Sequence, residues 1–417
     1  MAVSRFAAIN AGSYELMLKR YEISAGKKVR ILDNVRYVME LGRETYTEKK
    51  VSFETIEKMC DILEKFTKVL EEYQVTDYVA VATSGIREAE NAEIIVDRIK
   101  VRTGLNVRLI SNSEQRLYTY KALAMYPEEY EAFSKGNTAI LDVGAGSIQI
   151  SMMDKKNIAS TQNIKIGSMR IRELLLNLSE NMKHFDTLLD ELINNDLQTF
   201  KRMFIKDKAI DNIIATGEQI TLFTKNKNTG DFDRLMTTED FMGRYKQLNT
   251  KSQDELAKEL QVTSEQATIL IPCARIYGRF IEVVGCKNLW VPGTDICDGV
   301  AMDYAMSRKK IMDKHNFDED ILNEVRGISK RYKGNTVHIQ FVRSLAVQIF
   351  DVTKKIHGLS KRERLILELA AMLHDCGKYI SIHNAAECSY NIIMATEIIG
   401  LSHREREMLA QDRKSVV

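Results

Sequence analysis

The sequence has few prolines, almost no net charge and no long apolar run. Only 3 of its 417 residues are proline, so no Pro-rich linker separates its domains. The 60 Lys and Arg residues against 58 Asp and Glu residues leave a formal charge of +2, which excludes a polybasic nucleic-acid arm or a long acidic tail. No apolar stretch approaches the ~20 residues of a membrane span, and the first residues show no secretory signal. We therefore expect neither a nucleic-acid nor a membrane partner.

Cysteine is also scarce, and its spacing excludes paired metal motifs. The 6 cysteines form no Cys-x-x-Cys pair and are Cys60, Cys273, Cys286, Cys297, Cys376 and Cys388. This spacing predicts reduced thiols in a cytoplasmic protein without structural zinc. What is present is 44% hydrophobic and 28% charged residues, typical of a soluble globular protein. At roughly 100–200 residues each, two or three domains fit in the chain.

The N-terminal part alternates between strand-like and helix-like patterns. Residues 6–23 alternate apolar and polar residues around a tight turn, which predicts strand, turn and strand. Residues 52–73 carry apolar residues at helical spacing, with Ser52 as the N-cap. Two short apolar stretches, residues 78–83 and 107–110, predict further strands. This alternation favours an α/β domain.

An internal match divides the chain into two similar halves. Ile9-Asn10-Ala11-Gly12 aligns with Leu141-Asp142-Val143-Gly144. In both, an apolar strand ends in a short polar side chain, followed by a glycine turn and a second alternating strand. Beyond a boundary near residues 305–325 the strand-like alternation stops, and long helical patterns predict an all-helical domain.

The glycine turns have the layout of a phosphate cradle. In Gly144-Ala145-Gly146-Ser147, small residues would let backbone N–H groups approach an anion, and Ser147 adds a hydroxyl. Asp142 at the strand end is a candidate ligand of a divalent cation. An ordinary hairpin turn is the alternative, but the matching turn at Gly12 and Ser13 favours phosphate binding.

Three further candidates each have a simpler alternative. Glu114, which begins a predicted helix, is a candidate general base or an acid stabilised by the helix dipole. Arg87 is a candidate phosphate contact or a solvated surface arginine. His338, His374 and Asp375 are candidate metal ligands, or histidines satisfied by hydrogen bonds in the core.

The order of these motifs resembles that of the exopolyphosphatase/guanosine pentaphosphate phosphohydrolase family, and the C-terminal region is similar to the HD superfamily. The resemblance spans almost the whole chain. Its carriers are Ala8-Ile9-Asn10-Ala11-Gly12-Ser13, Val81-Ala82-Thr83-Ser84-Gly85-Ile86-Arg87-Glu88-Ala89, Glu114-Gln115-Arg116-Leu117, Leu141-Asp142-Val143-Gly144-Ala145-Gly146-Ser147, Ile166-Gly167-Ser168-Met169-Arg170 and residues 370–378.

The resemblance implies two actin-like (ribonuclease H-like) α/β domains, at 1–130 and 131–305, and an HD-like helical domain at 320–411. It also implies magnesium-dependent release of the terminal phosphate of inorganic polyphosphate or guanosine pentaphosphate. On this basis Glu114 is the catalytic base, Asp142 the metal-binding acid and Arg87 a phosphate contact. Relatives of this kind also imply a homodimer.

The chain departs from the family pattern around the expected metal. Asn10 and Gln149 stand where relatives carry carboxylates, and Tyr14 stands in place of an asparagine. Amide oxygens can bind Mg²⁺ but add no negative charge, so Asp142, Asn10 and Gln149 predict a weak site. A third glycine-rich phosphate turn of the family appears here as Ala215-Thr216-Gly217-Glu218-Gln219, in which Glu218 adds an anion. Two hypotheses stay open: a hydrolase of reduced activity, and a sensor that binds polyphosphate or nucleotide without turnover.

The C-terminal region departs as well. Residues 385–388 stand where HD relatives often have further histidines, and the chain ends before their distal helices. Residues 412–417 resemble translated sequencing adapter and are interpreted as a non-native tail. We therefore expect a fragment truncated near residue 411, with an incomplete helical domain and an incomplete HD ligand set.

Overall fold

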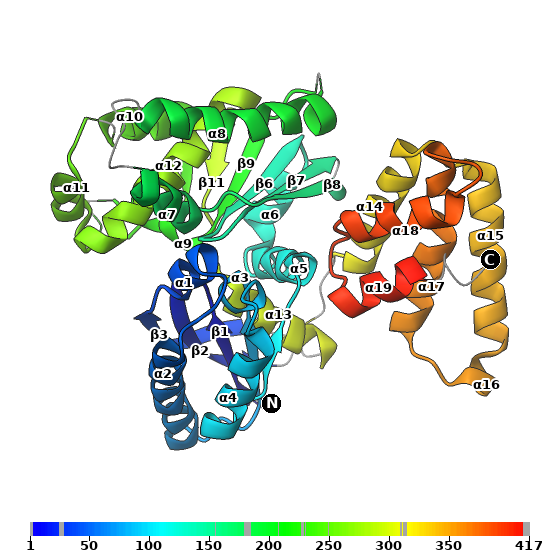
Figure 1. The fold of residues 1–417 in the computed structure, drawn as a ribbon, viewed down its shortest axis with the longest axis horizontal. Coiled ribbons are helices and arrows are strands. Elements are labelled where there is room, and N and C mark those ends of the chain that lie inside the picture. Colours follow the sequence, from blue (N-terminus) through cyan, green and yellow to red (C-terminus); the bar gives the residue numbers. More distant parts are fainter. Residues whose placement is uncertain are drawn as a thin grey trace. The chain divides into compact units, whose positions relative to one another are not determined.

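The computed structural model describes residues 3–24, 29–154, 156–178, 185–206, 208–226, 229, 231–248, 250–308, 311 and 315–411. The chain forms two compact units, one of residues 1–156 and 163–313, the other of residues 157–162 and 314–417. The first unit contains two sheets with helices packed on them (Figure 1). The predicted α/β class is confirmed. The interpreted tail at 412–417 lies outside the described residues.

The first sheet has five strands in the order β3-β2-β1-β4-β5. Its strands are β1 (Val3–Ala11), β2 (Glu15–Ser24), β3 (Val29–Val38), β4 (Tyr78–Ala82) and β5 (Val107–Leu109). Strands β1, β2 and β3 are antiparallel neighbours, whereas β1, β4 and β5 run parallel. The associated helices are α1 (Leu41–Thr47), α2 (Phe53–Glu72), α3 (Ser84–Arg87), α4 (Ala92–Thr103), α5 (Asn112–Leu123) and α6 (Pro127–Ser134).

The predicted elements of this half are present. The strand, turn and strand of residues 6–23 are β1 and β2, and the helix predicted at 52–73 is α2. Ser52 caps α2 as expected, because its hydroxyl accepts a hydrogen bond from the Thr55 backbone N–H at 3.3 Å. The buried face of α2 consists of the apolar residues at helical spacing, which pack on β1 and β4.

The second sheet has the order β10-β11-β9-β6-β7-β8. Its strands are β6 (Thr138–Val143), β7 (Ile148–Asp154), β8 (Asn157–Ile164), β9 (Asn212–Thr216), β10 (Leu235–Thr237) and β11 (Asn288–Trp290). The associated helices are α7 (Ser168–Leu178), α8 (Phe185–Phe200), the π-helix η2 (Lys201–Ile205), α9 (Glu218–Phe223), α10 (Thr238–Leu248), α11 (Gln253–Leu260) and α12 (Ser264–Val284).

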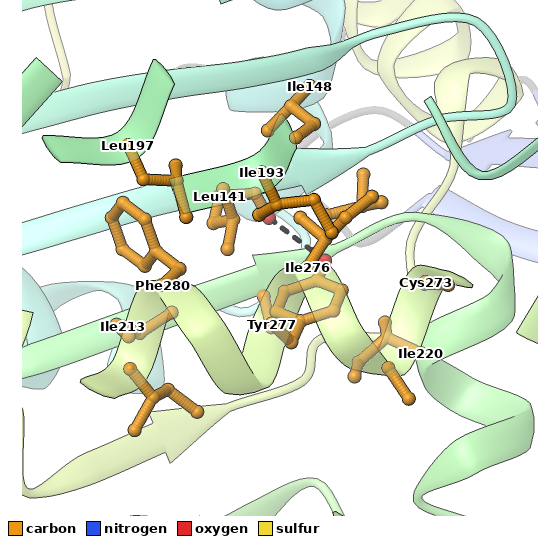
Figure 2. Close-up of a cluster of buried hydrophobic side chains, with 14 of the residues drawn as sticks. Leu141, Ile148, Ile193, Leu197, Ile213, Ile220, Cys273, Ile276, Tyr277 and Phe280 are labelled. Atoms are coloured by element: carbon orange, nitrogen blue, oxygen red, sulfur yellow. Dashed lines mark hydrogen bonds between the residues drawn. The ribbon is translucent and has the colours of Figure 1, made fainter. Parts of the chain in front are cut away.

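A dense apolar core lies between this sheet and its helices. Figure 2 shows Leu141 and Ile213 of the sheet facing Ile276, Tyr277 and Phe280 of α12. The buried Tyr277 hydroxyl donates toward the Leu141 carbonyl at 3.1 Å and also contacts the carbonyl of Thr216. Tyr277 therefore holds together the carboxyl ends of β6 and β9, from which the second and third glycine turns continue.

Helix α13 (Ile296–Ser307) returns to the first sheet. Its buried residues Cys297, Val300 and Ala301 pack with Phe6 and Tyr21 of β1 and β2. Residues 296–305 therefore belong structurally with the first sheet, although the sequence had grouped them with the second half. Hydrophobic periodicity identifies a buried helix but does not say which sheet buries it.

The second unit is helical apart from the segment 157–162. Its helices are α14 (Phe317–Arg331), α15 (Thr336–Val352), α16 (Lys354–His357), α17 (Lys361–Leu373), the 3-10 helix η3 (Cys376–Tyr379), α18 (Ala385–Ala395) and α19 (His403–Gln411). Buried Glu324 of α14 contacts the Thr161 hydroxyl and accepts the Ile399 N–H at 2.7 Å. The predicted helical character of the C-terminal region is confirmed.

All six cysteines are free thiols. In the part of the chain that the structure describes, no helix is long and apolar enough to cross a membrane.

Candidate functional site

Both predicted glycine turns line one cavity in the first unit. From the first hairpin come Asn10, Gly12 and Ser13, and from the second come Asp142 and the four turn residues Gly144, Ala145, Gly146 and Ser147. The third turn adds Gly217, which follows β9. Three turns at the carboxyl ends of β1, β6 and β9 thus meet at one point, where open α/β sheets place their ligands.

The two hairpin turns share the same backbone hydrogen bond. The N–H of Gly12 donates to the Glu15 carbonyl at 2.9 Å, and the N–H of Gly144 donates to the Ser147 carbonyl at 3.0 Å. The residue after each glycine accepts a backbone hydrogen bond from a neighbouring helix. In the first half the Ser13 carbonyl accepts from the N–H of Gly42 in α1 at 2.7 Å. In the second half Ala145 accepts from the first turn of α7. The internal sequence match therefore corresponds to the same local backbone twice.

Two glycines of the cavity are required by their surroundings. A Cβ at Gly146 would lie 2.1 Å from the Tyr46 hydroxyl, which no side chain tolerates. Gly217 has a φ of +115°, and a Cβ there would lie 2.7 Å from the Val143 carbonyl oxygen. Both turns consequently expose backbone rather than side chains to the cavity, as an anion cradle requires.

Three buried hydroxyl groups meet at the first turn. Ser13 Oγ lies 2.7 Å from Tyr46 Oη and 2.9 Å from Ser84 Oγ. Ser84 begins α3, and the 81–89 motif reaches the cavity through Thr83 and Ser84. The guanidinium of Arg170, from α7, stacks over the Tyr46 ring at 4.0 Å. Tyr46 thus contacts elements of both halves.

Asp142 is on β6, which lies between β7 and β9 in the second sheet. It pairs with Thr216 of β9 in the parallel register and with Gln149 of β7 in the antiparallel register. Burial raises the pKa of Asp142 from 3.8 to about 6, while the Thr216 and Thr119 hydroxyls and Arg116 act in the opposite direction. The carboxyl group therefore titrates close to neutral pH.

The polar atoms around Asp142 fit a weakly bound divalent cation. Asn10 lines the cavity with Asp142, and its buried Oδ1 accepts no hydrogen bond. Gln149 Oε1 is also buried and accepts no hydrogen bond, but Gln149 is not among the residues that line the cavity. Because directly opposed residues share a face of the sheet, Gln149 is on the same face as Asp142. One carboxylate with amide oxygens is compatible with Mg²⁺, which usually takes one or two carboxylates plus substrate phosphates and water. Among the described residues, no group of three or more His, Cys, Asp and Glu side chains is arranged for a metal ion.

Glu114 and Arg87, the other two predicted catalytic residues, are not among the residues that line the cavity. Glu114 forms a capping box with Ser111 at the start of α5 and pairs with Arg108. Arg87 donates to the Ile110 carbonyl at 2.5 Å and also contacts Asn112. Glu114 thus acts at the start of its helix, in line with its simpler alternative, whereas Arg87 is partly buried and hydrogen-bonded and is not a solvated surface arginine.

Gln115 and Thr119 line the cavity, and sequence reasoning missed both. They are four residues apart on α5 and therefore share a helix face. The signal was present: the spacing of Ser111 and Glu114 is that of a capping box, which commits the glutamate to the helix end. With Glu114 committed to the cap, Gln115 is the first residue of the α5 face that lines the cavity.

A second group of charges lines another part of the cavity. Glu15, Glu218 and Asp295 all face it. Arg36 of β3 contacts Glu218 and lies 3.3 Å from Asp295 and 3.6 Å from Glu15. Lys19 of β2 also pairs with Asp295. Burial and the neighbouring Glu218 raise the pKa of Glu15 from 4.5 to about 9, so Glu15 is protonated at neutral pH.

The predicted HD-like residues His338, His374 and Asp375 lie in the second unit. The rings of His338 and His374 are 4.9 Å apart between centroids. His374 Nδ1 hydrogen-bonds the Ala371 carbonyl at 2.8 Å, and Asp375 pairs with Lys378 at 2.7 Å. The two histidines therefore meet, while the aspartate is held by a lysine of the next turn.

Two sheets built around matching hairpins and meeting at one cavity define the actin-like class of α/β folds. The crystal structure of the Aquifex aeolicus member of the Ppx/GppA family superposes with a TM-score of 0.60 at 22% identity, covering 76% of this chain and 100% of that chain. An exopolyphosphatase from Cytophaga hutchinsonii gives a TM-score of 0.62 at 19% identity, covering 73% and 97%. These likenesses establish the fold.

The family of the chain is shown by its sequence. Residues 21–306 match the Ppx/GppA phosphatase family, and residues 322–413 match Ppx/GppA phosphatase domain III. The chain belongs to the Ppx/GppA phosphatase family, which confirms the predicted resemblance. It is 19% identical over 416 residues to guanosine-5'-triphosphate,3'-diphosphate pyrophosphatase of Aliivibrio fischeri (strain MJ11), covering 97% of this chain and 79% of that protein. The HD-like character of the C-terminal region stays a prediction.

Proposed function

We propose that this chain hydrolyses a terminal phosphoanhydride bond and releases orthophosphate, with inorganic polyphosphate or guanosine pentaphosphate as the candidate substrates. The observation that carries the proposal is the convergence of three glycine turns and Asp142 on one cavity. In the reaction a water oxygen forms a bond to the terminal phosphorus, the bond to the bridging oxygen breaks, and a proton is released.

Phosphate oxygens would bind to the two hairpin turns. Gly12 and Ser13 on one side, and residues 144–147 on the other, offer backbone N–H groups and two serine hydroxyls. Such donors are fixed before substrate arrives and so cost little reorganisation in the transition state. The close contacts of Gly146 and Gly217 support this arrangement, because they keep side chains out of the cradle.

The attacking water is assigned to the α5 face of the cavity. Phosphoryl transfer relies more on positioning and charge neutralisation than on a strong base, and a glutamine can orient the water. Gln115 and Thr119 line the cavity beside Asp142, which supports Gln115 as the water-positioning residue. Glu114 stays the base predicted from the sequence, but its hydrogen bonds to the helix start and to Arg108 favour Gln115 for this position.

Asp142, Asn10 and Gln149 would hold Mg²⁺, and the ion would supply charge neutralisation when bound. The unpartnered amide oxygens of Asn10 and Gln149 support this ligand set. With one carboxylate among the three, we expect weak binding that substrate phosphates complete.

Orthophosphate release from inorganic triphosphate and from long-chain polyphosphate, each with Mg²⁺, tests the proposal. We expect release by the wild-type chain and a loss of about 10²-fold or more in Asp142→Asn. Asp154→Asn is the matched control, because Asp154 is partly exposed at the end of β7. Binding of these substrates without any release would exclude the hydrolase and favour the sensor.

A further inference from the structure

A second cavity lies among the helices α9, α10 and α11 of the half that contains the second sheet. Its volume is about 360 Å³, against about 130 Å³ for the cavity at the glycine turns. Among the described residues, the two cavities share none of their lining. Sites that enclose a small organic molecule usually measure roughly 300–1,000 Å³, so the second cavity is large enough for one.

The walls of this second cavity are held in place by the surrounding fold. The three helices all pack on α12. The chain that follows α9 is tied back, because the Asp233 N–H donates to the Thr224 carbonyl at 2.9 Å and Lys225 forms a β-bridge with Phe232. The site is therefore built on helix packing and backbone hydrogen bonds, which position its side chains without a ligand.

The floor of the cavity is apolar. Phe223, Leu248 and Leu256, one from each helix, are buried and line it. The ring of Phe223 lies 5.0 Å from the ring of Phe241 between centroids, so the core fixes its position. An inorganic anion would leave this floor facing water, whereas the face of a ligand ring would cover it.

Cationic side chains outnumber acids at the same cavity. Its described lining contains Lys225, Arg244 and Lys251 and one acid, Glu259. Arg244 pairs with Asp233, which is not part of the lining, and Lys251 pairs with Glu259. With both acids counted, three positive charges stand against two negative charges. The cavity therefore favours an anionic ligand.

The ammonium group of Lys225 carries this excess charge. It donates to the Leu260 carbonyl at 3.4 Å and to Gln261 Oε1 at 3.3 Å, which are both neutral oxygens. Among the described residues, no carboxylate pairs with it. Lys225 can consequently form a charge-assisted hydrogen bond to a phosphate oxygen without giving up an ion pair.

Asn226 and Gln247 add amide groups to the lining. An amide offers both donors and an acceptor, as the polar edge of a base or the hydroxyls of a ribose require. We propose that this second cavity binds a nucleotide, with the base against the apolar floor and the phosphate group at Lys225. The inference does not rest on the proposed hydrolysis, because the two cavities share no described lining residue and its test needs no turnover.

The experiment measures the dissociation constants of AMP and GMP by calorimetry, beside those of adenosine, guanosine and orthophosphate. EDTA is present, because it removes the Mg²⁺ on which phosphate binding beside Asp142 is proposed to depend. Lys225→Gln removes the charge without leaving a carboxylate unpaired, and Lys225→Arg keeps the charge. Lys246→Gln is the matched control, because Lys246 is exposed on α10 and does not line the cavity. Thermal midpoints confirm that each variant is folded.

We expect the wild-type chain to bind at least one of the two nucleotides ~10-fold or more tightly than its nucleoside and than orthophosphate. Lys225→Gln should weaken this binding ~10-fold, the usual effect of losing a charge-assisted hydrogen bond. Lys225→Arg and Lys246→Gln should bind like the wild type. No binding of either nucleotide, equal affinity for orthophosphate, or unchanged affinity in Lys225→Gln would overturn the inference.

Photolabelling tests the location independently. The wild-type chain is irradiated with 8-azido-AMP, and the labelled peptides are identified by mass spectrometry. Label within residues 223–260 supports the second cavity. Label confined to the glycine turns at residues 10–15 and 142–147 would place the nucleotide in the first cavity and overturn the inference.

Discussion

The hydroxyl of Tyr46 lies 2.7 Å from the hydroxyl of Ser13, so a residue of α1 holds a side chain of the first glycine turn in place. The same hydroxyl is 3.1 Å from Ser84, and its position excludes any side chain at Gly146 in the second turn. Arg170 of α7 covers the ring. One buried tyrosine therefore links the two turns to which the phosphate is assigned.

Tyr46→Phe should weaken orthophosphate binding about tenfold, because Ser13 loses the partner that orients its hydroxyl. The loss of stability should stay near ~1 kcal/mol, the usual contribution of a buried hydrogen bond. Affinity is measured by calorimetry and stability by denaturant unfolding, with Tyr37→Phe at an exposed tyrosine of β3 as the control. Unchanged affinity in Tyr46→Phe would show that Ser13 is positioned without it.

Glu114→Gln should lower the free energy of unfolding by ~0.5–2 kcal/mol, because it weakens the capping box of α5 and the pair with Arg108. The rate of orthophosphate release should change only a few-fold. Gln115→Ala should instead reduce the rate strongly while stability changes little. Rates and thermal midpoints of both variants distinguish the roles, and a 10²–10⁴-fold loss in Glu114→Gln would restore Glu114 as the general base.

Glu15→Gln should raise stability at alkaline pH. In the folded chain the pKa of Glu15 is about 9, against 4.5 for an ordinary glutamate, because burial and Glu218 disfavour its charged form. The folded state therefore holds an extra proton between these values, and the free energy of unfolding falls as pH rises from about 4.5 to about 9. In Glu15→Gln the free energy of unfolding should not show this fall, because glutamine has no proton to release.

Thermal midpoints at pH 4.5, 7 and 9 check this prediction. The difference between Glu15→Gln and the wild type should be smallest at pH 4.5 and grow with pH, whereas Glu72→Gln, at an exposed position of α2, should run parallel to the wild type. A constant difference across the range would mean that Glu15 ionises normally in the folded chain.

The second unit should retain no stoichiometric metal after dialysis. His338 and His374 meet, but Asp375 pairs with Lys378 and leaves the histidines without a carboxylate ligand. Elemental analysis of the dialysed chain checks this, with His374→Ala as the comparison. Metal that survives dialysis in the wild type and is lost in His374→Ala would show a true HD-type site.

Much of the local structure of both units could be predicted from the sequence. The strand and turn pairs at Gly12 and Gly144, the capped helix α2 and the helical C-terminal region were predicted, because periodicity, glycine and cap residues act over a few positions. The matching backbone of the two turns also follows from the repeated sequence, whereas their meeting at one cavity depends on how the two sheets pack. Family membership rested on the order of these local motifs.

Tertiary structure decided which neighbour of a motif faces the cavity. Adjacent residues on a helix point about 100° apart, so only the packing of α5 determined that Gln115 enters the cavity while Glu114 caps the helix. The return of α13 to the first sheet, and the contact of Arg36 with Glu218 across 182 residues, are equally beyond local pattern. The sequence by itself determined the local units and the family. The charge of the cavity wall depended on long-range contacts, because they alone set which carboxylates a cation can reach.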